Sequence, residues 1–213
     1  MSKSTKNKIC GITHPEDGRF ASGLFVDYLG FIFYDKSPRF IEPAKAGAII
    51  NWLEGPEKVG VFVNQPLDEV NATAKETGLD LVQLHGNETP EYCELIEKPI
   101  IKAIHITLDS TKKTLQEKID QYNDVVDFFL FDTKVGDQWG GTGKTFDWDI
   151  VKDLTSKPFF LSGGLNSDNV KEAIDTLDPY AVDISSSIEE EPGLKDLEKM
   201  EIFVNTVKPV ELI

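Results

Sequence analysis

Eight short apolar segments recur along this chain, and the end of each lies about 25 residues after the end of the one before. They are Lys8–Cys10, Tyr28–Phe33, Val59–Val63, Leu81–His85, Ile100–Ile104, Phe128–Asp132, Phe159–Ser162 and Val182–Ser185. Most are almost continuously apolar, as in "FFLFD" and "VGVFV", rather than alternating. Strands that are buried on both faces have this composition, so the pattern predicts a parallel sheet covered by helices.

Helical patterns occupy the intervals between these segments. Thr13 with Glu16 three residues later suggests a capping box, while Pro43 and Gly55 mark the expected start and end of a second helix. Further helices are expected at Leu67–Thr77, Pro90–Glu97, Ser110–Gln121, Trp148–Leu154, Ser167–Leu177 and Leu194–Val207. Each interval accommodates one strand, one helix and two loops.

Eight such units in 213 residues predict an α/β protein with a single-domain (β/α)8 TIM barrel. The alternative is an open doubly wound sheet, which usually has a glycine-rich first turn. The first turn here is "CGITHP", without a G-x-G-x-x-G pattern, so the barrel is favoured. We expect residues 1–7 to be a flexible N-terminal leader and residues 8–213 to form the barrel domain.

Composition limits the partners of this chain. The formal net charge of −15 would repel polyanions, so neither nucleic acid nor an anionic membrane is an expected partner. Two cysteines cannot form a disulfide framework, and they suit the reducing environment of a cytoplasmic protein. No apolar run approaches the length of a membrane span.

The residues that follow the predicted strands are unusually polar. In a TIM barrel the active site lies at the C-terminal ends of the strands, and the loops after strands seven and eight often hold phosphate. Those loops carry Gly163, Gly164, Ser185 and Ser186. Glycine lets a ligand approach the backbone and serine adds hydroxyl donors, so we expect phosphate binding there. Either pair alone would suit an ordinary turn.

Cys10 and Asp132 are the candidate proton-transfer groups. A cysteine at a strand end is either a small core residue or, beside a positive group such as Lys8, a thiolate base. Asp132 is either a loop carboxylate or, since it ends the apolar run "FFLF", a desolvated acid with a raised pKa. Strands seven and eight separate strand six from strand one, so these two side chains should face each other across the barrel mouth.

Other polar and aromatic residues have simpler interpretations. Arg39 lies in the loop after strand two, where a planar guanidinium would suit a carboxylate. His85 and His105 end strands and are expected to be hydrogen-bonding scaffold. Cys93 is expected in the core, and Trp52 and Trp148 are expected to be packing residues of helices. No His/Cys/Asp/Glu cluster has the sequence spacing of a metal site, so we expect neither a metal nor a cofactor.

The stretch "DQWGGTGKTFDWD" looks at first like a nucleotide-binding P-loop. A P-loop requires a glycine five residues before the Gly-Lys-Ser/Thr element. Counted back from Gly143-Lys144-Thr145, that position is Gln138, so the motif fails.

Together, the strand-end sequences resemble phosphoribosylanthranilate isomerase, a barrel enzyme of tryptophan biosynthesis. The similar stretches are, in chain order, "KICGIT", "GFIFYDKSPRFI", "VGVFVNQ", "VQLHGNE", "FLFD", "GGTGKTFDW", "LSGGLN" and "VDISSSIE". They span the chain from Lys8 to about Asp196. "GGTGKTFDW" is similar to the family's flexible glycine-rich loop after strand six, which lies beside the substrate.

The resemblance implies an Amadori rearrangement of N-(5-phosphoribosyl)anthranilate to 1-(2-carboxyphenylamino)-1-deoxyribulose 5-phosphate. It implies Asp132 as general acid on the ribose ring oxygen and Cys10 as general base at C2. Arg39 would hold the anthranilate carboxylate, and Gly141 and Asp183 would lie near the phosphate and the ribose. The expected partner is a small phosphorylated sugar. We expect a monomer, with a homodimer as the alternative.

One residue departs from the family, and two other functions stay open. The family usually has glycine where this chain has Ser187, which would strain the loop if a positive φ were needed. A related phosphosugar barrel is one alternative, either indole-glycerol-phosphate synthase or the histidine-pathway isomerase. The synthase would need a catalytic lysine and carboxylates, and the isomerase aspartates where Cys10 and His105 stand. A non-catalytic phosphosugar-binding barrel is the other.

Overall fold

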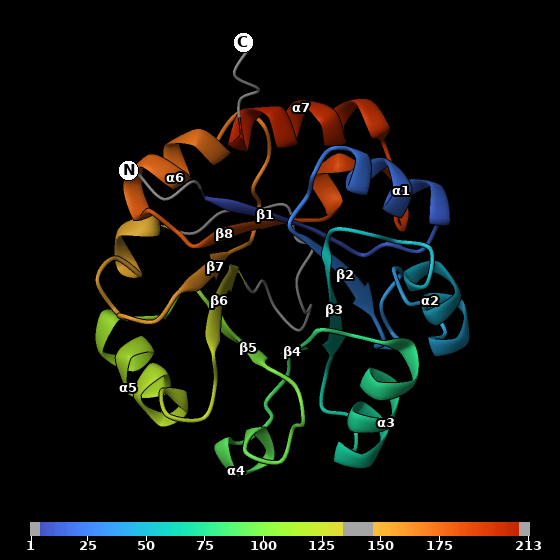
Figure 1. The fold of residues 1–213 in the computed structure, drawn as a ribbon. Helices are drawn as coiled ribbons and strands as arrows, with labels where there is room; N and C mark the ends of the chain where they lie inside the picture. Colours follow the sequence, from blue (N-terminus) through green and yellow to red (C-terminus); the bar gives the residue numbers. More distant parts are fainter. Residues whose placement is uncertain (1–4, 134–146, 209–213) are drawn as a thin grey trace.

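A computed structural model describes residues 5–133 and 147–208 of the protein. Eight strands pair side by side in chain order, all in parallel, and the last pairs with the first to close a barrel (Figure 1). They are β1 (Lys6–Cys10), β2 (Tyr28–Ile32), β3 (Glu57–Phe62), β4 (Leu81–Leu84), β5 (Ile100–Ile106), β6 (Phe128–Thr133), β7 (Phe159–Leu161) and β8 (Ala181–Ile184). The predicted fold is confirmed.

Helices surround the strands on the outside of the barrel (Figure 1). The described helices are α1 (Pro15–Gly23), α2 (Pro43–Ile50), α3 (Leu67–Thr77), α4 (Pro90–Cys93), α5 (Lys112–Tyr122), α6 (Val170–Leu177) and α7 (Leu197–Val207), with short 3-10 turns η1 (Trp148–Ile150) and η2 (Ser186–Ile188). Local sequence explains several ends. Thr111 and Thr114 form a capping box on α5, and Gly78 ends α3 at a φ of +74°. Among the described helices, none combines the length and apolar character that crossing a bilayer requires.

Several predicted helix bounds are wrong. The helix expected at Pro90–Glu97 ends at Cys93, and the one expected at Trp148–Leu154 is only the 3-10 turn η1. The helix expected from Ser167 begins at Val170. Thr13 does not cap α1, which begins after His14; its hydroxyl donates instead to the carbonyl of Gly193. The second helix ends at Ile50, and Trp52 beyond it is 83 % exposed rather than a packing residue of that helix. The helix expected from Leu194 begins only at Leu197.

A small hairpin occupies the start of that last predicted helix. It consists of β9 (Glu189–Glu191) and β10 (Leu194–Lys195), which pair in antiparallel fashion. Gly193 turns the chain with a φ of +93°, a conformation that favours glycine. The first strand also differs from the prediction, because β1 begins at Lys6 rather than Lys8.

Strand side chains alternate between the barrel interior and the space under the helices, which gives the protein two apolar clusters. Nearer the N-terminal ends of the strands, buried side chains supplied by strands alone form an apolar cluster, here called the barrel floor. Its members are Tyr28, Val59, Leu81, Ile101, Ala103, Leu130, Phe160 and Ala181. A second and larger core fills the space between strands and helices. Two residues further along a strand, the next inward-facing side chain lies at the C-terminal end of the barrel, here called the mouth.

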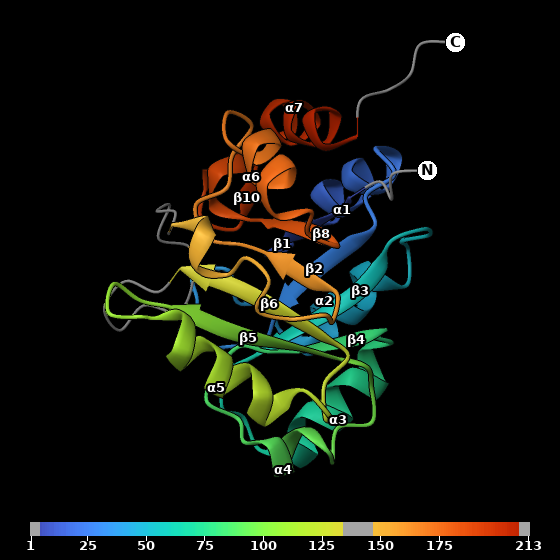
Figure 2. The same cartoon turned by 90° about the vertical axis from the view of Figure 1, so that its left-hand side faces the viewer.

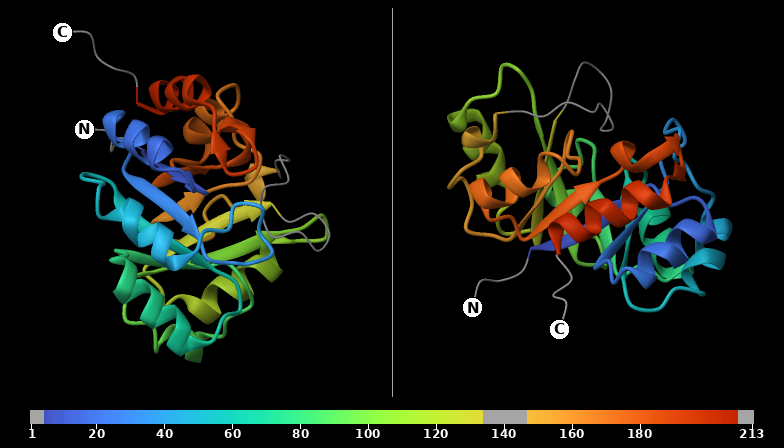
Figure 3. Two further views of the ribbon diagram at one scale, coloured as in Figure 1. Left: turned by 90° about the vertical axis from the view of Figure 1, so that its right-hand side faces the viewer. Right: turned by 90° about the horizontal axis from the view of Figure 1, so that it is seen from above.

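The first and last parts of the chain lie side by side. Helices α1 and α7 are neighbours beside β1 and β8 (Figures 2 and 3). The backbone N–H of Lys195 donates to Asp17, and Lys208 forms an ion pair with Asp27. The chain ends thus help to close the barrel at the strands that carry the candidate site.

Candidate active site

Polar side chains from most of the barrel strands gather at one cavity in the mouth. Its volume is about 80 Å³. It is lined by Cys10, Ile32, Tyr34, Ser37, Arg39, Val61, Val63, Gln83, His85, Asp132, Ser162, Asp183 and Ser185. Ligand pockets commonly measure about 300–1,000 Å³, so this cavity suits the reacting part of a ligand whose remainder extends outward. A larger pocket of about 690 Å³ over β2 and β3 contains neither Cys10 nor Asp132.

The Cys10 thiol lies at the end of β1 and is 7 % exposed. Two residues earlier, the fully buried Lys8 places its ammonium 2.9 Å from a carboxylate oxygen of Asp183. Burial raises the pKa of the Cys10 thiol, and the positive charge of Lys8 offsets that rise only in part. The neighbour that a thiolate needs is therefore present, but the thiol remains the favoured form at neutral pH.

Asp183 reaches the same cavity from β8 and is also buried. Burial raises the pKa of the Asp183 carboxyl group. The ammonium of Lys8 acts in the opposite direction, and the charge of Asp132 adds to the increase, so the pKa stays above its usual value. Oxygen Oδ2 accepts a hydrogen bond from Lys8, whereas Oδ1 has no partner among the described residues. A buried acceptor without a partner is costly, so a ligand hydroxyl would be bound favourably there.

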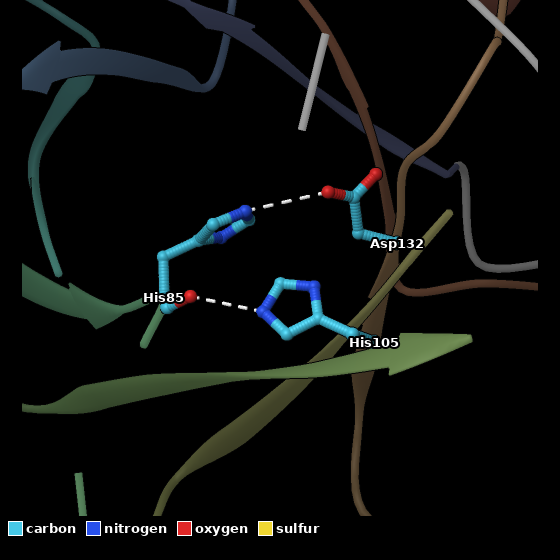
Figure 4. Close-up of side chains that lie close together, drawn as sticks. All are labelled: His85, His105 and Asp132. Atoms are coloured by element: carbon cyan, nitrogen blue, oxygen red, sulfur yellow. Dashed lines mark hydrogen bonds and ion pairs between the residues drawn. The ribbon is translucent and has the colours of Figure 1, made fainter. Parts of the chain in front are cut away.

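Asp132 is the last residue but one of β6 and is 2 % exposed. Its Oδ2 lies 3.3 Å from Nε2 of His85 (Figure 4). The side-chain amide of Gln83 contacts Nδ1 of the same ring at 3.0 Å. Because that amide nitrogen can only donate, a neutral His85 carries its proton on Nε2, facing Asp132. His85 thus orients the carboxyl group through a hydrogen bond, in agreement with its expected role.

His105 lies beside this pair and completes a cluster of three possible metal ligands. Its Nε2 is 2.9 Å from the carbonyl of His85, and one ligand atom from each of His85, His105 and Asp132 lies within 4.8 Å of the others. Sequence spacing did not indicate this cluster because three different strands supply it. Two imidazoles and a carboxylate could hold Zn²⁺. The His85–Asp132 contact would have to open first, so the geometry favours hydrogen bonding.

The loop after β7 approaches Asp132 closely because two successive glycines adopt positive φ. Gly163 has φ +87° and Gly164 φ +69°. A Cβ atom on Gly163 would lie 2.5 Å from the backbone nitrogen of Thr133 and 3.0 Å from Oδ1 of Asp132. Only glycine fits both the conformation and the space.

Backbone N–H groups are the available donors in the two loops. Within the described residues, the backbone N–H groups of Gly163, Gly164, Ser185 and Ser186 have no hydrogen-bond acceptor. The hydroxyl of Ser185 is engaged, since it donates to the carbonyl of Cys10 at 3.0 Å. An anion bound here would therefore accept hydrogen bonds from backbone N–H groups and not from the Ser185 hydroxyl.

Ser187 causes no strain in the loop after β8. It lies within the 3-10 turn η2 and is absent from the described residues with positive φ. Its hydroxyl donates to the carbonyl of Leu165 and so joins the loops after β7 and β8. The serine is therefore compatible with the loop conformation.

Arg39 lines the cavity, but it already binds a carboxylate of the chain itself. Its Nε donates to Oε1 of Glu189 at 2.9 Å and its Nη2 to Oε2 at 2.7 Å. Burial raises the pKa of Glu189, but hydrogen bonds from Arg39 and Lys195 outweigh burial and hold it below its usual value. Three guanidinium N–H bonds remain available to a ligand.

Sequence reasoning missed both Glu189 and Lys195. Lys195 is 2 % exposed, and its Nζ lies 2.8 Å from Oε1 of Glu189. Burial lowers the pKa of Lys195, which Glu189 raises only in part. The signal was the Pro192-Gly193 pair, which indicates a turn between two short strands; a hairpin there places Glu189 opposite Lys195.

Two remaining expectations have simple outcomes. Cys93 is 1 % exposed and belongs to the core, as predicted. Gly141, expected near the phosphate, and most of the "GGTGKTFDW" stretch lie outside the described residues.

Comparison with known proteins gives a consistent result. The family model described as N-(5'-phosphoribosyl)anthranilate (PRA) isomerase matches residues 7–206. The N-(5'-phosphoribosyl)anthranilate isomerase of Geobacter sulfurreducens is 43 % identical over 203 residues, covering 94 % of this chain and 97 % of the relative. That of Pseudomonas putida is also 43 % identical, covering 95 % and 97 %.

Solved structures agree. Phosphoribosyl anthranilate isomerase from Thermotoga maritima superimposes with a TM-score of 0.87 at 38 % identity, covering 96 % of this chain and 98 % of that one. A phosphoribosyl anthranilate isomerase in complex with reduced 1-(o-carboxyphenylamino)-1-deoxyribulose 5-phosphate has a TM-score of 0.84 at 36 % identity, with the same coverage. The chain therefore belongs to the N-(5'-phosphoribosyl)anthranilate isomerase family.

Proposed function

We propose that this protein converts N-(5'-phosphoribosyl)anthranilate into 1-(2-carboxyphenylamino)-1-deoxyribulose 5-phosphate in tryptophan biosynthesis. The single observation that carries the mechanism is that Cys10 and Asp132 line one cavity, while the loops after β7 and β8 lie between their strands. A ring-opening isomerisation requires one acid and one base at a shared substrate, and the presence of a carboxyl group and a thiol in one cavity supports this proposal.

Asp132 acts as the general acid in the first step. Its carboxyl proton passes to the ribose ring oxygen as the bond between that oxygen and C1 breaks. The nitrogen lone pair forms the C1=N bond, which gives a protonated Schiff base. The contact with His85 supports this role, because it fixes the direction of the carboxyl group at 3.3 Å.

Cys10 acts as the general base in the second step. Its thiolate removes the proton from C2, and the electron pair moves toward the iminium nitrogen to give an enolamine. The product forms when C1 gains a proton and the C2 hydroxyl loses one, so the reaction is a net isomerisation. The nearby ammonium of Lys8 supports this role because it favours the thiolate.

Each end of the substrate has a proposed binding group. The phosphate is held by backbone N–H groups of Gly163, Gly164, Ser185 and Ser186, with Gly141 as a further candidate. Arg39 binds the anthranilate carboxylate through N–H bonds that Glu189 leaves free. Oxygen Oδ1 of Asp183 accepts a ribose hydroxyl, which is supported by its lack of a partner among the described residues.

A fluorescence assay tests this proposal. Freshly made phosphoribosylanthranilate is added to the parent, Cys10→Ser, Asp132→Asn and Cys93→Ala proteins, and loss of anthranilate-type fluorescence is followed. The parent and the Cys93→Ala control should turn over, whereas each site variant should lose about 10²–10⁴-fold in kcat. An inactive parent would refute the activity, and fully active site variants would refute the assignment of acid and base.

The remaining expectations are proposals of the same kind. We propose that one barrel domain, which includes Lys6 and Asn7 of β1 as well as residues 8–213, carries the activity in the cytoplasm, as a monomer. A Thermotoga maritima relative is described as dimeric, with monomers generated from it. Sedimentation equilibrium of the full chain decides this point: a monomer gives 23.8 kDa, and twice that mass would replace the proposal with a dimer.

A further inference from the structure

We propose that Lys195 and Glu189 are positioning residues that prepare Arg39 to bind an aryl carboxylate: Glu189 fixes the guanidinium, and Lys195 neutralises Glu189 so that Arg39 keeps an effective positive charge. This inference rests on the proposed function, because it concerns how the same site recognises the carboxylate end of its substrate. Lys195, Glu189 and Arg39 are called here the cation brace.

Glu189 holds the Arg39 guanidinium by two of its five N–H bonds. The distances are 2.9 Å from Nε to Oε1 and 2.7 Å from Nη2 to Oε2, which is a charge-assisted bidentate pair. The Glu189 side chain is 4 % exposed and that of Arg39 is 12 % exposed, so neither end of the pair is freely solvated. Arg39 lines the cavity, and its unused N–H bonds can receive a second carboxylate there.

Charge balance explains why a third residue is needed. An Arg39–Glu189 pair alone has no net charge, and Glu189 would repel a second carboxylate at the same guanidinium. Lys195 places its ammonium 2.8 Å from Oε1 of Glu189 with a fully buried side chain. The cation brace therefore has two cations and one carboxylate, a net charge of +1. Because the formal net charge of the chain is −15, the protein as a whole repels anions, and this local positive charge would favour the binding of an anionic ligand.

The cation brace is also joined to the other parts of the site. Lys195 Nζ donates to the carbonyl of Ser185 at 3.2 Å, and the hydroxyl of Ser185 donates to the carbonyl of Cys10 at 3.0 Å. The stem of Arg39 packs against Gly11, where an added Cβ would lie 2.8 Å from its Cδ. The carboxylate-binding group, a proposed phosphate-binding residue and the thiol strand are thus held in one connected unit.

Two ligands that differ only in the carboxylate separate its contribution to the binding free energy from those of the phosphate and the sugar. One probe is reduced 1-(o-carboxyphenylamino)-1-deoxyribulose 5-phosphate, and the other is the same reduced compound with phenylamine in place of the carboxyphenylamine. Calorimetric titration gives the ratio of the two dissociation constants, in which shared contacts cancel. We expect the parent to favour the carboxylated probe by about 10- to 100-fold, as for hydrogen bonds between charged groups.

Lys195→Met should lower this ratio to about threefold or less, because it removes one charge and leaves a neutral Arg39–Glu189 pair. Lys199→Met is the matched control. It removes the same formal charge nearby, but the Lys199 side chain is 51 % exposed, and its polar partners in the described part of the chain are the backbone carbonyl of Glu189 and the Asp196 side chain. Its ratio should equal that of the parent.

The double variant Glu189→Gln/Lys195→Met separates charge from a general loss of structure. It restores a net charge of +1 on Arg39, so it should recover most of the parent's ratio, and it serves alone if Lys195→Met does not fold. A folded Lys195→Met protein with the parent's ratio would overturn the inference, as would a double variant without carboxylate preference. A parent that turns over phosphoribosylanthranilate while failing this test would leave the proposed function intact.

Discussion

The two ends of the barrel interior differ in chemistry although the same strands build both. On β6, Leu130 belongs to the barrel floor and Asp132, two residues later, reaches the cavity in the mouth. On β8, Ala181 and Asp183 repeat this change. Side chains two residues apart on a strand point to the same side, so one inward-facing row passes from apolar to ionisable within a single step.

This difference indicates that the floor stabilises the fold, whereas the mouth carries the ionisable groups of the candidate site. The floor removes large apolar side chains from water, which stabilises the fold. The mouth buries charged groups such as Lys8, Asp183 and Lys195, and these are costly to desolvate even when they are paired. We therefore expect substitutions in the floor to change the free energy of unfolding and substitutions in the mouth to change turnover.

The largest effect is expected for Asp132→Asn in the mouth. Turnover should fall by about 10²–10⁴-fold because the proton donor is lost. The thermal midpoint should change little, since asparagine keeps the shape and one acceptor oxygen toward His85. Fluorescence kinetics and circular dichroism melting measure the two quantities. A large drop in the melting temperature would show that the mouth also stabilises the fold, and it would contradict the proposed difference between floor and mouth.

Phe160→Ala tests the floor. Phe160 is fully buried, with its ring 5.3 Å from that of Tyr28 in an edge-to-face contact, so its truncation should cost about 3–5 kcal/mol of unfolding free energy. Urea unfolding measures the loss, and kcat per folded molecule should stay near the parent's value. Phe25→Ala is the control, because Phe25 is 86 % exposed and should change stability by no more than about 0.5 kcal/mol. Equal effects of the two variants would refute the role of the floor.

Gly163→Ala probes the contact between the mouth and the loop after β7. Backbone strain at φ +87° should cost about 1–3 kcal/mol, and displacement of the loop from Asp132 should also raise KM. Gly55→Ala separates the two causes, because Gly55 has φ +102° but no atom within 4 Å of an added Cβ. It should lose stability without a change in KM. A KM equal to the parent's in Gly163→Ala would contradict this prediction.

The last prediction concerns the protonation of the Cys10 thiol. Burial raises the pKa of Cys10, so less thiolate is present at neutral pH than for an ordinary cysteine. Below the thiol pKa, alkylation of Cys10 in a Cys93→Ala background should accelerate by about tenfold per pH unit, because only the thiolate reacts. An alkylation rate that stays constant between about pH 7 and 9 would contradict a raised thiol pKa.

Much of the fold was predictable because its signals are local. Continuously apolar strand segments and their even spacing indicated a parallel barrel, and the strands formed close to the predicted positions. The failures arose where distant contacts decide local structure. Thr13 bonds Gly193 instead of capping α1, and nothing near Trp52 in the sequence showed that its helix would end at Ile50.

The site was predictable to the extent that topology brings strand ends together. Cys10 and Asp132 were identified from their positions alone, and both line the cavity. The pairing of Lys8 with Asp183 could not be predicted, because it depends on the register between β1 and β8. The engagement of Arg39 by Glu189 could not be predicted, because the sequence pattern places Leu194 and Lys195 at the start of a helix, whereas they form the second strand of the hairpin that presents Glu189.

Pairing of β8 with β1 has a consequence for how activity arises during folding. Lys8 meets Asp183, and Cys10 meets Ser185, across 175 residues of sequence, and each pair straddles the junction where the ring of strands closes. Long-range pairings of this kind form late and slowly. An intermediate with every strand formed but an unjoined ring would have Lys8 without Asp183, and Cys10 without the hydrogen bond from Ser185. We expect such an intermediate to be inactive, so recovery of turnover during refolding should report the final docking of the chain's two ends rather than the earlier growth of its helices.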